Sequence, residues 1–298
     1  MMEPIRVAVL GAGGLGRAAC RIIGMKRELQ LVAICDSKGL IASPEGVACE
    51  RIASGSGDLV SNYLSGESSA PNGNGHGGGP RLAEGEGRGT CATATASAVH
   101  CDDPLQATAE WGSAIDAVLV TLPNMPNDFI PTVIRQFIRR RGGTVFVDVL
   151  KRTAAVEQMF ALDALVKETG SVVLTGCGAT PGLLTAAAVL AAQSFIQVER
   201  VDIWWGVGIA NWDAYKATIR EDIAHVPGYS VERAKAMTDE DVETFLSRTG
   251  GLLELHHMEH ADDVLLERAG VVDSRTQVEV GGVMDTRHSK KPVSTTMT

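Results

Sequence analysis

Aromatic residues are scarce in this sequence, because four Trp, three Tyr and six Phe make up only 4% of the 298 residues. Proteins that bind single-stranded nucleic acid stack bases on such side chains, so the scarcity argues against that class. A surplus of basic residues is also missing, since 27 Lys and Arg against 36 Asp and Glu leave a formal charge of −9. Phosphate-backbone binders need that surplus, and we therefore expect no nucleic-acid partner.

Cysteine pairs, a secretory leader and a membrane-spanning run are missing as well. Six Cys residues stand at positions 20, 35, 49, 91, 101 and 177 without a C-x-x-C pair, which predicts reduced and mostly buried thiols. The N-terminal segment MMEPIRVAVL carries no basic leader or cleavage site. The longest apolar run, near 183–192, is much shorter than the ~18–20 residues that span a bilayer. These absences predict a soluble, cytoplasmic protein with no membrane partner.

Glycine is abundant instead, with 33 residues, and it gathers in two kinds of segment. One is the stretch 65–90, in which nine of 26 residues are Gly and Leu82 is the one large apolar side chain. Such a segment buries too little surface to offset the entropy of ordering, so we interpret it as a flexible surface insertion. A phosphate-cradling loop is the alternative, but no strand precedes it and no Gly-Lys-Ser/Thr follows.

The other glycine-rich segment lies inside a β-α-β unit. IRVAVL at 5–10 predicts a strand, GAGGLG follows, and RAACRIIGMKREL has the apolar spacing of a helix before the strand LQLVAIC at 29–35. The alternation continues with strands near 114–123, 144–150 and 171–178 and helices near 128–140, 153–168 and 183–194. We therefore expect an α/β fold with a Rossmann doubly wound parallel sheet over residues 1–176, interrupted by the insertion at 65–90.

Beyond residue 176 the pattern changes. Strand-like runs stand at 198–208, 275–282 and 291–298, and helical runs at 213–225, 231–248 and 262–269. We expect the last two strands to be joined by a hairpin. The segment 177–298 is thus predicted to be a second domain of α+β type.

The GAGGLG segment matches the dinucleotide fingerprint Gly-x-Gly-x-x-Gly in the context that the motif requires, after a strand and before a helix. Gly11 permits the tight turn, Gly13 lets the backbone approach a pyrophosphate, and Gly16 allows close helix–strand packing. The helix N-terminus provides N–H groups and a positive dipole end for the anion. We predict that the cofactor is held by Gly11, Ala12, Gly13, Gly14, Leu15 and Gly16.

Asp36 lies twenty residues beyond Gly16, at the end of the second strand. A carboxylate there accepts hydrogen bonds from a ribose diol and repels a 2′-phosphate, which favours NAD(H). Ser37 and Lys38 follow directly and would hold a 2′-phosphate if Asp36 turned away, so NADP(H) stays open. Asp36 as a plain turn residue is a further alternative, and FAD fits less well because no second adenine-side motif is visible.

A later strand ends in the sequence Thr121-Leu122-Pro123-Asn124. The carboxyl ends of parallel strands line the ligand crevice of an open α/β sheet. We expect the backbone of these four residues to pass the nicotinamide ribose, against the alternative of a purely structural turn.

Four segments carry a resemblance to a known group, namely IRVAVLGAGGLGRAA, VTLPN, VFVDVLKRTAAVEQ and TGCGATPG. They resemble the saccharopine dehydrogenase-like reductases, within a wider set that includes dihydrodipicolinate reductase, diaminopimelate dehydrogenase and glucose–fructose oxidoreductase types. The resemblance covers residues 4–50 and 92–195, and the Gly-x-x-Pro-Gly turn at 178–182 indicates the saccharopine side. It implies a nicotinamide-dependent oxidoreductase with a sheet-forming substrate and dimerisation domain, and hence a homodimer. Such proteins end with a segment that returns to the nucleotide domain, so we expect this chain to be incomplete at its C-terminus.

Hydride transfer needs a proton donor or acceptor beside the nicotinamide. Lys151 follows the strand at 144–150 and resembles in position the lysine of glucose–fructose oxidoreductase-type enzymes, so we predict that it acts as an acid or polarises a carbonyl. An ordinary charge at a helix start is the alternative. His225, close to Asp222 and Tyr229 in the sequence, is the second catalytic candidate, against a structural histidine.

The turn at 175–182 precedes a helix whose N-terminus is suited to a substrate carboxylate. We therefore assign substrate binding to Gly178, Thr180, Pro181 and Gly182. Cys177 as a nucleophile is the weaker interpretation, because a buried thiol beside glycine is the commoner case.

His256 and His260 would share one face of a helix, as paired metal ligands do. The metalloprotease pattern needs Glu directly after the first His, and His257 stands there instead. No third ligand is indicated, so we predict no metal site.

Together these residues predict an NAD(P)-dependent oxidoreductase that acts on an amino acid, an imino acid or a related carbonyl compound. Two alternatives stay open, because a fold does not fix an activity. One is a non-enzymatic dinucleotide sensor, and the other is a synthase that uses NAD during its cycle, as homospermidine synthase-like proteins do. The expected partners are a small-molecule substrate and a second copy of the chain.

Overall fold

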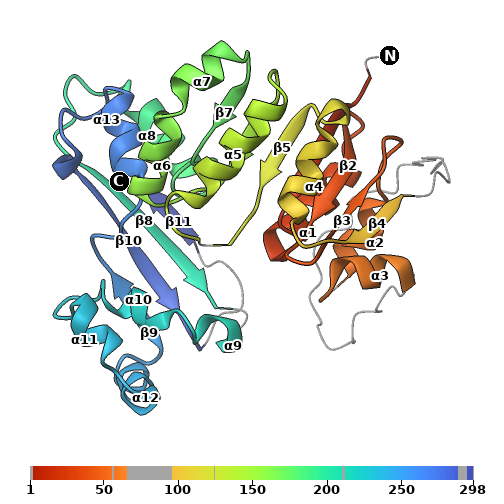
Figure 1. The fold of residues 1–298 in the computed structure, drawn as a ribbon. Coiled ribbons are helices and arrows are strands. Elements are labelled where there is room, and N and C mark those ends of the chain that lie inside the picture. Colours follow the sequence, from red (N-terminus) through yellow and green to blue (C-terminus); the bar gives the residue numbers. More distant parts are fainter. Residues whose placement is uncertain are drawn as a thin grey trace, which may run out of the picture. The chain divides into compact units, whose positions relative to one another are not determined.

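Figure 1 shows the computed structural model, which describes residues 3–55, 57–65, 96–123, 125–209, 212–287 and 294–297. The chain forms two compact units. The first holds the described residues up to Asp148 together with Gln158–Thr175, and the second holds Val149–Glu157 and the described residues from Gly176 onward. Apart from Ser65, the predicted insertion at 65–90 lies outside the described residues.

The first unit is built on a seven-stranded sheet in the order β4-β3-β2-β1-β5-β6-β7. Its strands are β1 (Ile5–Leu10), β2 (Leu29–Cys35), β3 (Gly39–Ala42), β4 (Ser97–His100), β5 (Ala117–Val120), β6 (Val145–Asp148) and β7 (Val172–Leu174). Five strands, from β2 through β1 and β5 to β7, pair in parallel, whereas β3 and β4 pair antiparallel at one edge. The predicted Rossmann sheet is therefore present, with an antiparallel edge.

Helices lie between the strands of this unit along the chain, and α1 (Gly14–Gly24) and α5 (Phe129–Arg140) each join two parallel strands (Figure 1). The others are α2 (Cys49–Ser54) and α3 (Leu59–Ser65) between the antiparallel β3 and β4, α4 (Pro104–Glu110), α7 (Asp163–Glu168), and α6 (Thr153–Phe160), whose residues up to Glu157 belong to the second unit. A short 3-10 helix covers Gly112–Ala114. The central strands read as continuous apolar runs because both of their faces are covered, and Val9, Ile34 and Val118 are fully buried.

Two features of the first unit differ from the expectation. The segment 36–64, which shows only weak helical signals in the sequence, contains β3 as well as α2 and α3. The single helix predicted at 153–168 is two helices, α6 and α7. Leu162 causes the break, because its N–H bonds the Met159 carbonyl three residues back and its side chain turns into the core at 2% exposure.

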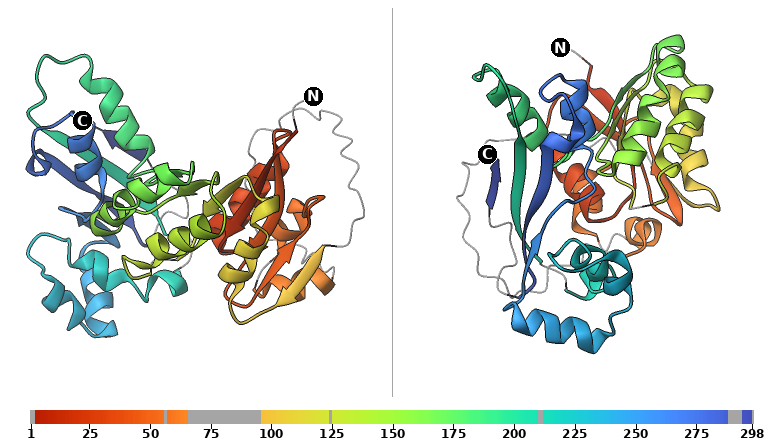
Figure 2. Two further views of the ribbon diagram at one scale, coloured as in Figure 1. Left: turned by 45° about the horizontal axis from the view of Figure 1, so that its top comes forward. Right: turned by 90° about the vertical axis from the view of Figure 1, so that its left-hand side faces the viewer.

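The second unit is built on a four-stranded sheet in the order β11-β8-β10-β9. Its strands are β8 (Val201–Gly208), β9 (Leu252–Leu255), β10 (Val278–Asp285) and β11 (Ser294–Met297). Its helices are α8 (Leu183–Ala192), α9 (Trp212–Tyr215), α10 (Ile219–Ile223), α11 (Val231–Lys235), α12 (Asp239–Arg248) and α13 (Asp262–Arg268), with a 3-10 helix at Arg275–Gln277. The long strands β8 and β10 run parallel, side by side, in both views of Figure 2.

The predicted hairpin between the last two strands is wrong, because β10 and β11 pair with opposite edges of β8 and not with each other. The helix predicted at 231–248 is interrupted before α12. Thr238 and Asp241 cause this by forming a capping box, in which the Thr238 hydroxyl accepts the Asp241 N–H at 3.1 Å and the carboxylate accepts the Thr238 N–H at 2.8 Å. Strand β9 was not predicted.

One segment inside residues 1–176 is grouped with the second unit. Val149–Glu157 lies within the predicted first domain, yet its contacts are with the second unit. The Lys151 carbonyl accepts the Ala261 N–H at 2.7 Å, and Thr153 bonds the Asp263 carboxylate at 3.2 Å. Among the described helices, none is long and apolar enough to cross a bilayer.

Candidate active site

The turn between β1 and α1 accepts only glycine at two positions. Gly11 has φ +104°, and a Cβ atom there would lie 2.7 Å from the Thr121 carbonyl oxygen. At Gly16 a Cβ atom would lie 1.8 Å from the Gly11 carbonyl oxygen. The Thr121 hydroxyl lies 3.0 Å from the Leu10 oxygen and 2.7 Å from the Gly11 oxygen, which holds the turn against the end of β5.

The middle of the same turn is open. A Cβ atom at Gly13 or Gly14 would meet no atom of the described part of the chain within 4 Å, and both residues are exposed, as is Leu15. Helix α1 begins at Gly14, and its first backbone bond runs from the Arg17 N–H to the Gly13 oxygen. The N–H groups of the residues before Arg17 therefore have no acceptor within the helix. They lie at its N-terminus, where the helix dipole is positive. This is a cradle of the kind that holds a pyrophosphate.

A cavity of about 790 Å³ opens at this turn. Ten of the predicted cofactor residues line it, namely Gly11, Ala12, Gly13, Gly14, Leu15, Asp36, Ser37, Thr121, Leu122 and Pro123. Gly16 and Lys38 do not line it, and Asn124 lies outside the described residues. The residues that the sequence reasoning missed are Gly57, Asp102, Asp103, Pro104, Leu105, Met125 and Phe129.

Most of the missed residues come from the start of α4. The signal for this helix is Asp103 followed by Pro104, since the Asp103 carboxylate caps α4 by accepting the Gln106 N–H at 2.9 Å and proline suits the first helical position. The signal identifies a helix start, but only the fold brings that start beside the β1–α1 turn.

Asp36 both lines the cavity and shapes its own turn. One carboxylate oxygen accepts the N–H groups of Lys38 at 2.8 Å and Gly39 at 3.0 Å. The other accepts the Leu59 N–H at 3.1 Å and keeps a second lone pair. The carboxylate is thus fixed in orientation, and it can accept one further hydrogen bond from a ligand.

Lys151 lies near the start of Val149–Glu157, the segment that belongs to the second unit. Its side chain is exposed, and among the described residues its ammonium group has no hydrogen bond or ion pair. Its charge acts on two buried groups: it opposes the rise that burial causes in the pKa of Asp222, and it adds to the fall that burial causes in the pKa of His260. Lys151 therefore shares an electrostatic environment with residues from two other parts of the second unit.

His225 follows α10 and is tied to the segment after β9. Its Nδ1 lies 3.2 Å from the His256 carbonyl oxygen, and its own carbonyl accepts the His256 N–H at 2.9 Å. A carbonyl only accepts, so Nδ1 carries the hydrogen and Nε2 keeps its lone pair when the ring is neutral. Asp222, one turn earlier, accepts the Tyr215 hydroxyl at 2.8 Å, and burial raises the pKa of this carboxyl group. Tyr229 packs instead on Phe245.

The turn at 175–182 brings Thr180 to a buried carboxylate. The Thr180 hydroxyl donates to Asp262 at 2.7 Å, and the Thr185 hydroxyl donates to the other oxygen at 2.5 Å. Asp262 is fully buried, which raises the pKa of its carboxyl group. The Thr180 oxygen also lies 3.4 Å from Nδ1 of His260. A chain of polar groups therefore runs from Asp262 through Thr180 to His260.

His260 is the buried end of that chain, at 7% exposure. Within the part of the chain that the structure describes, its Nε2 has no hydrogen-bond partner. Burial, followed by the charges of Lys151 and His225, lowers the pKa of His260 to about 4. The imidazole is thus neutral at neutral pH, with Nδ1–H directed to Thr180.

The expected use of the α8 N-terminus for a substrate carboxylate finds no support. The N–H groups of Leu183 and Leu184 donate to the carbonyls of Gly178 and Ala179, and the Gly182 N–H donates to the Thr185 hydroxyl at 2.8 Å. These donors are occupied by the turn itself. Gly178, Thr180, Pro181 and Gly182 accordingly build a loop that presents Thr180 to Asp262, with a cis bond before Pro181 and φ +131° at Gly182.

Two further expectations about side chains are wrong. His256 and His260 do not share a helical face, because His256 directly follows β9 and His257 has φ +49°. His256 bonds the carboxylates of Glu279 at 3.0 Å and Glu254 at 3.1 Å. Cys177 is exposed rather than buried, whereas Cys20, Cys35 and Cys49 are buried free thiols. Among the described residues, no group of three or more His, Cys, Asp or Glu side chains is placed to hold a metal ion.

Comparison with solved structures finds oxidoreductases at low similarity. The 3-ketoreductase KijD10 from Actinomadura kijaniata is 14% identical, with a TM-score of 0.39 over 96% of this chain and 71% of its own. The WlbA dehydrogenase from Bordetella pertussis, solved with NADH and UDP-GlcNAcA, is 14% identical, with a TM-score of 0.39 over 72% of this chain and 47% of its own. Scores of this size identify no activity, and the fold assignment rests on the strand order.

Comparison with curated proteins gives a much stronger match. No family model matches the chain. The protein named (S)-8-amino-7-oxononanoate synthase BioU, from Haloferax mediterranei, is 39% identical over 298 residues, which cover 99% of this chain and 83% of that relative. An identity of this size over nearly the whole length establishes common descent, and the chain belongs to the (S)-8-amino-7-oxononanoate synthase BioU family.

Proposed function

We propose that this protein is an NAD(P)-dependent oxidoreductase, with NAD(H) as the favoured cofactor. The observation that carries the proposal is the cavity at the β1–α1 turn, which combines an open glycine cradle with the fixed carboxylate of Asp36. The first turn of α1 would bind the pyrophosphate through its free N–H groups. The remaining lone pair of Asp36 would accept a hydrogen bond from the adenosine ribose.

The residues of the cavity fit a nicotinamide dinucleotide on three grounds. Leu122 and Pro123 offer an apolar rim at the end of β5, Gly13 and Gly14 leave room for phosphate, and Asp36 stands at the end of β2. When bound, the cofactor supplies or removes a hydride. The protein then has to bind the second substrate and to move a proton.

We infer that the amino ketone named in the relative, (S)-8-amino-7-oxononanoate, takes part in the reaction of this protein, either as the second substrate or as the product. A 7-oxo group is a carbonyl that a lysine ammonium can polarise, so Lys151 would donate a proton or a hydrogen bond to its oxygen. His225 has its Nδ1–H bonded to the His256 carbonyl, which leaves Nε2 to accept a proton from the neighbouring amino group.

The relative's name also favours one of the open alternatives, a synthase that uses the dinucleotide within its cycle. In that case the amino ketone is a product, and the same groups serve in the reverse direction. The narrower resemblance to saccharopine dehydrogenase-like reductases, the cytoplasmic location and the homodimer stay predictions.

The experiment that tests the proposal separates binding from turnover. NADH fluorescence enhancement measures cofactor binding to the purified chain, and absorbance at the nicotinamide band then follows oxidation or reduction on addition of 8-amino-7-oxononanoate and related amino and keto acids. Binding with substrate-dependent turnover supports the oxidoreductase. Binding without turnover favours the sensor alternative, and no binding of either dinucleotide overturns the proposal.

Lys151 is tested by the substitution Lys151→Met, which keeps the length of the side chain and removes its charge. Turnover should fall by about 10²-fold or more, because proton transfer and carbonyl polarisation contribute 10²–10⁴-fold to such reactions. The dissociation constant for NADH should stay within about twofold of the wild-type value, since no part of Lys151 lines the dinucleotide cavity. Lys167→Met, at an exposed position on α7, is the matched control. Wild-type turnover in Lys151→Met would refute the assigned role.

A further inference from the structure

The ribose end of the dinucleotide cavity has three charged side chains around one short segment of the chain. Arg17 comes from α1, and Asp36 and Lys38 come from the turn after β2. Three consecutive residues, Gly57, Asp58 and Leu59, each bind one of them. The Gly57 carbonyl accepts an Arg17 N–H at 3.0 Å, Asp58 lies 3.6 Å from the Lys38 ammonium, and the Leu59 N–H donates to Asp36 at 3.1 Å.

Both cations are thereby directed away from the cavity. Arg17 also donates to the Ile52 carbonyl at 2.8 Å, so its guanidinium group is held by two backbone oxygens. Neither Arg17 nor Lys38 lines the cavity. Among the described residues, the charged ones that do line it are Asp36, Asp102 and Asp103, and all three are acidic.

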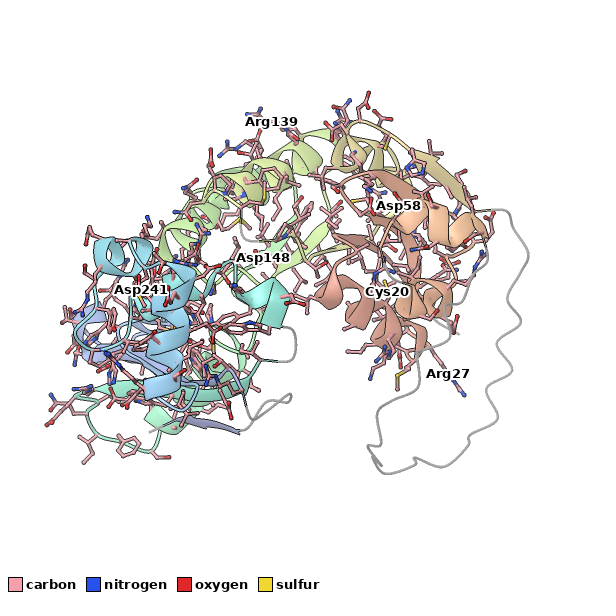
Figure 3. The ribbon with its side chains drawn as sticks, turned by 90° about the horizontal axis from the view of Figure 1, so that it is seen from below. Cys20, Arg27, Asp58, Arg139, Asp148 and Asp241 are labelled. Atoms are coloured by element: carbon pink, nitrogen blue, oxygen red, sulfur yellow. The ribbon has the colours of Figure 1, made fainter. Side chains whose placement is uncertain are left out.

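Asp58 is well suited to hold Lys38. Its Oδ1 accepts the Ser61 N–H at 2.8 Å, and hydrogen bonds from Ser61 lower the pKa of the Asp58 carboxyl group. Asp58 is therefore ionised at neutral pH and carries the charge that pairs with the lysine. Figure 3 shows Asp58 in the first unit, beside α3. His100 lies near the same carboxylate oxygen that accepts the Ser61 N–H, with its Nε2 atom 3.9 Å from Asp58 Oδ1.

We propose that Asp58 sets the dinucleotide preference of this protein by withholding Lys38 from the cavity. This inference rests on the proposed dinucleotide binding and adds a residue that selects between the two forms. A 2′-phosphate carries negative charge and needs a cation or a row of N–H donors beside the ribose. With Lys38 paired and Asp36 fixed, the described residues that line this position offer carboxylates and Ser37 but no cation, so NADPH is disfavoured through like-charge repulsion as well as through the absence of a cationic partner.

The test removes the charge of Asp58 and keeps its hydrogen bond. Asn at this position still accepts the Ser61 N–H, so Asp58→Asn should fold as the wild type does. Dissociation constants for NADH and NADPH are measured by nucleotide fluorescence for the wild type, Asp58→Asn, Lys38→Ala and the double variant. Glu110→Gln removes the same charge at the far end of α4 and serves as the matched control.

The wild type should bind NADH at least about tenfold more tightly than NADPH. Asp58→Asn should tighten NADPH binding by about three- to tenfold and leave NADH within about twofold, because freeing one lysine changes a single partly exposed contact. The gain should vanish in the double variant, and Glu110→Gln should change neither constant. A gain that survives without Lys38, or no gain in Asp58→Asn, overturns the proposal. If the wild type binds neither dinucleotide, the proposed function falls as well, so the two failures are distinguishable.

Discussion

At the scale of single residues, two neighbouring glycines of the β1–α1 turn have different physical roles. Gly16 is enclosed, so Gly16→Ala would force a Cβ atom against the Gly11 carbonyl and the Thr121 hydroxyl. Gly14 faces open space, so the methyl group of Gly14→Ala meets no atom of the described residues within 4 Å. We expect Gly16→Ala to lower the free energy of unfolding by ~2 kcal/mol or more, as steric overlap in a core does.

Gly14→Ala is the matched control for that prediction. It should leave the melting temperature nearly unchanged and weaken NADH binding, since its methyl group would project into the cavity beside the N–H groups of the first helical turn that would bind a pyrophosphate. Thermal unfolding and nucleotide fluorescence measure the two effects separately. Equal melting temperatures for the two variants would contradict this division of roles.

His260 makes stability depend on pH in a defined window. Its pKa is about 4 in the folded chain and 6.5 in the unfolded one, so below pH 6.5 the unfolded chain binds the extra proton. Stability from this group is complete above pH 6.5 and is lost as the pH falls from there to about 4. The loss amounts to about 3 kcal/mol.

The comparison with His260→Asn isolates this effect. Asn keeps a donor toward Thr180 and does not titrate. The free energy of unfolding of the variant should therefore fall less than that of the wild type between pH 6.5 and 4. Asp222 and Asp262 act in the opposite direction, because burial raises the pKa of each, but they are present in both proteins. Denaturant titrations at several pH values give the difference, and parallel curves for the two proteins would show that His260 titrates normally.

The candidate site could be predicted from the sequence only where neighbours in the chain create it. Gly11, Gly13 and Gly16 are recognisable because one turn and one helix fix their roles. Asp58 and Asp262 give no such signal. Each acquires its role from a residue distant in the sequence, Lys38 for Asp58 and Thr180 for Asp262, and no spacing rule connects these pairs.

At the scale of elements, α12 depends on the capping box at its N-terminus. Thr238→Ala would leave the Asp241 N–H without its acceptor and should destabilise the second unit by about 1 kcal/mol. Ser247→Ala on the same helix is the control, because it removes only a side-chain bond to the Glu243 carbonyl and favours the helix. Urea unfolding followed by circular dichroism measures both. A control as destabilised as Thr238→Ala would argue against the cap.

Strands and helices differed in how well the sequence predicted them. β1 and β2 are buried on both faces, so their apolar runs identify them directly. β9 alternates between exposed and buried residues over only four positions, a signal too short to recognise. Continuous helical periodicity likewise hid two breaks, because the bond from Leu162 to Met159 and the cap at Thr238 are decided by local hydrogen bonds and not by apolar spacing.

At the scale of the whole molecule, the chain passes between its two units three times. It leaves the first at Asp148, returns at Gln158 and leaves again after Thr175. The alternation of strands and helices in the sequence predicted a single boundary near residue 176, because it continues without interruption through the excursion, Val149–Glu157. The excursion is revealed only by long-range bonds such as that between Lys151 and Ala261.

Because the chain passes between the two units three times, its segments cannot all fold in the order in which they are synthesised. A ribosome releases Lys151 well before Asp222, His225 and His260, and folding proceeds from the N-terminus as the chain emerges. The first unit can close its sheet once β7 has been synthesised. Val149–Glu157 must wait for partners some seventy to 120 residues later, because the charge of Lys151 acts on Asp222 and the Glu157 carboxylate accepts a hydrogen bond from Arg275 at 2.8 Å. A nascent chain arrested before β9 would therefore carry a completed nucleotide turn, while Lys151 still lacked the Ala261 N–H and the buried His260 that surround it in the folded unit.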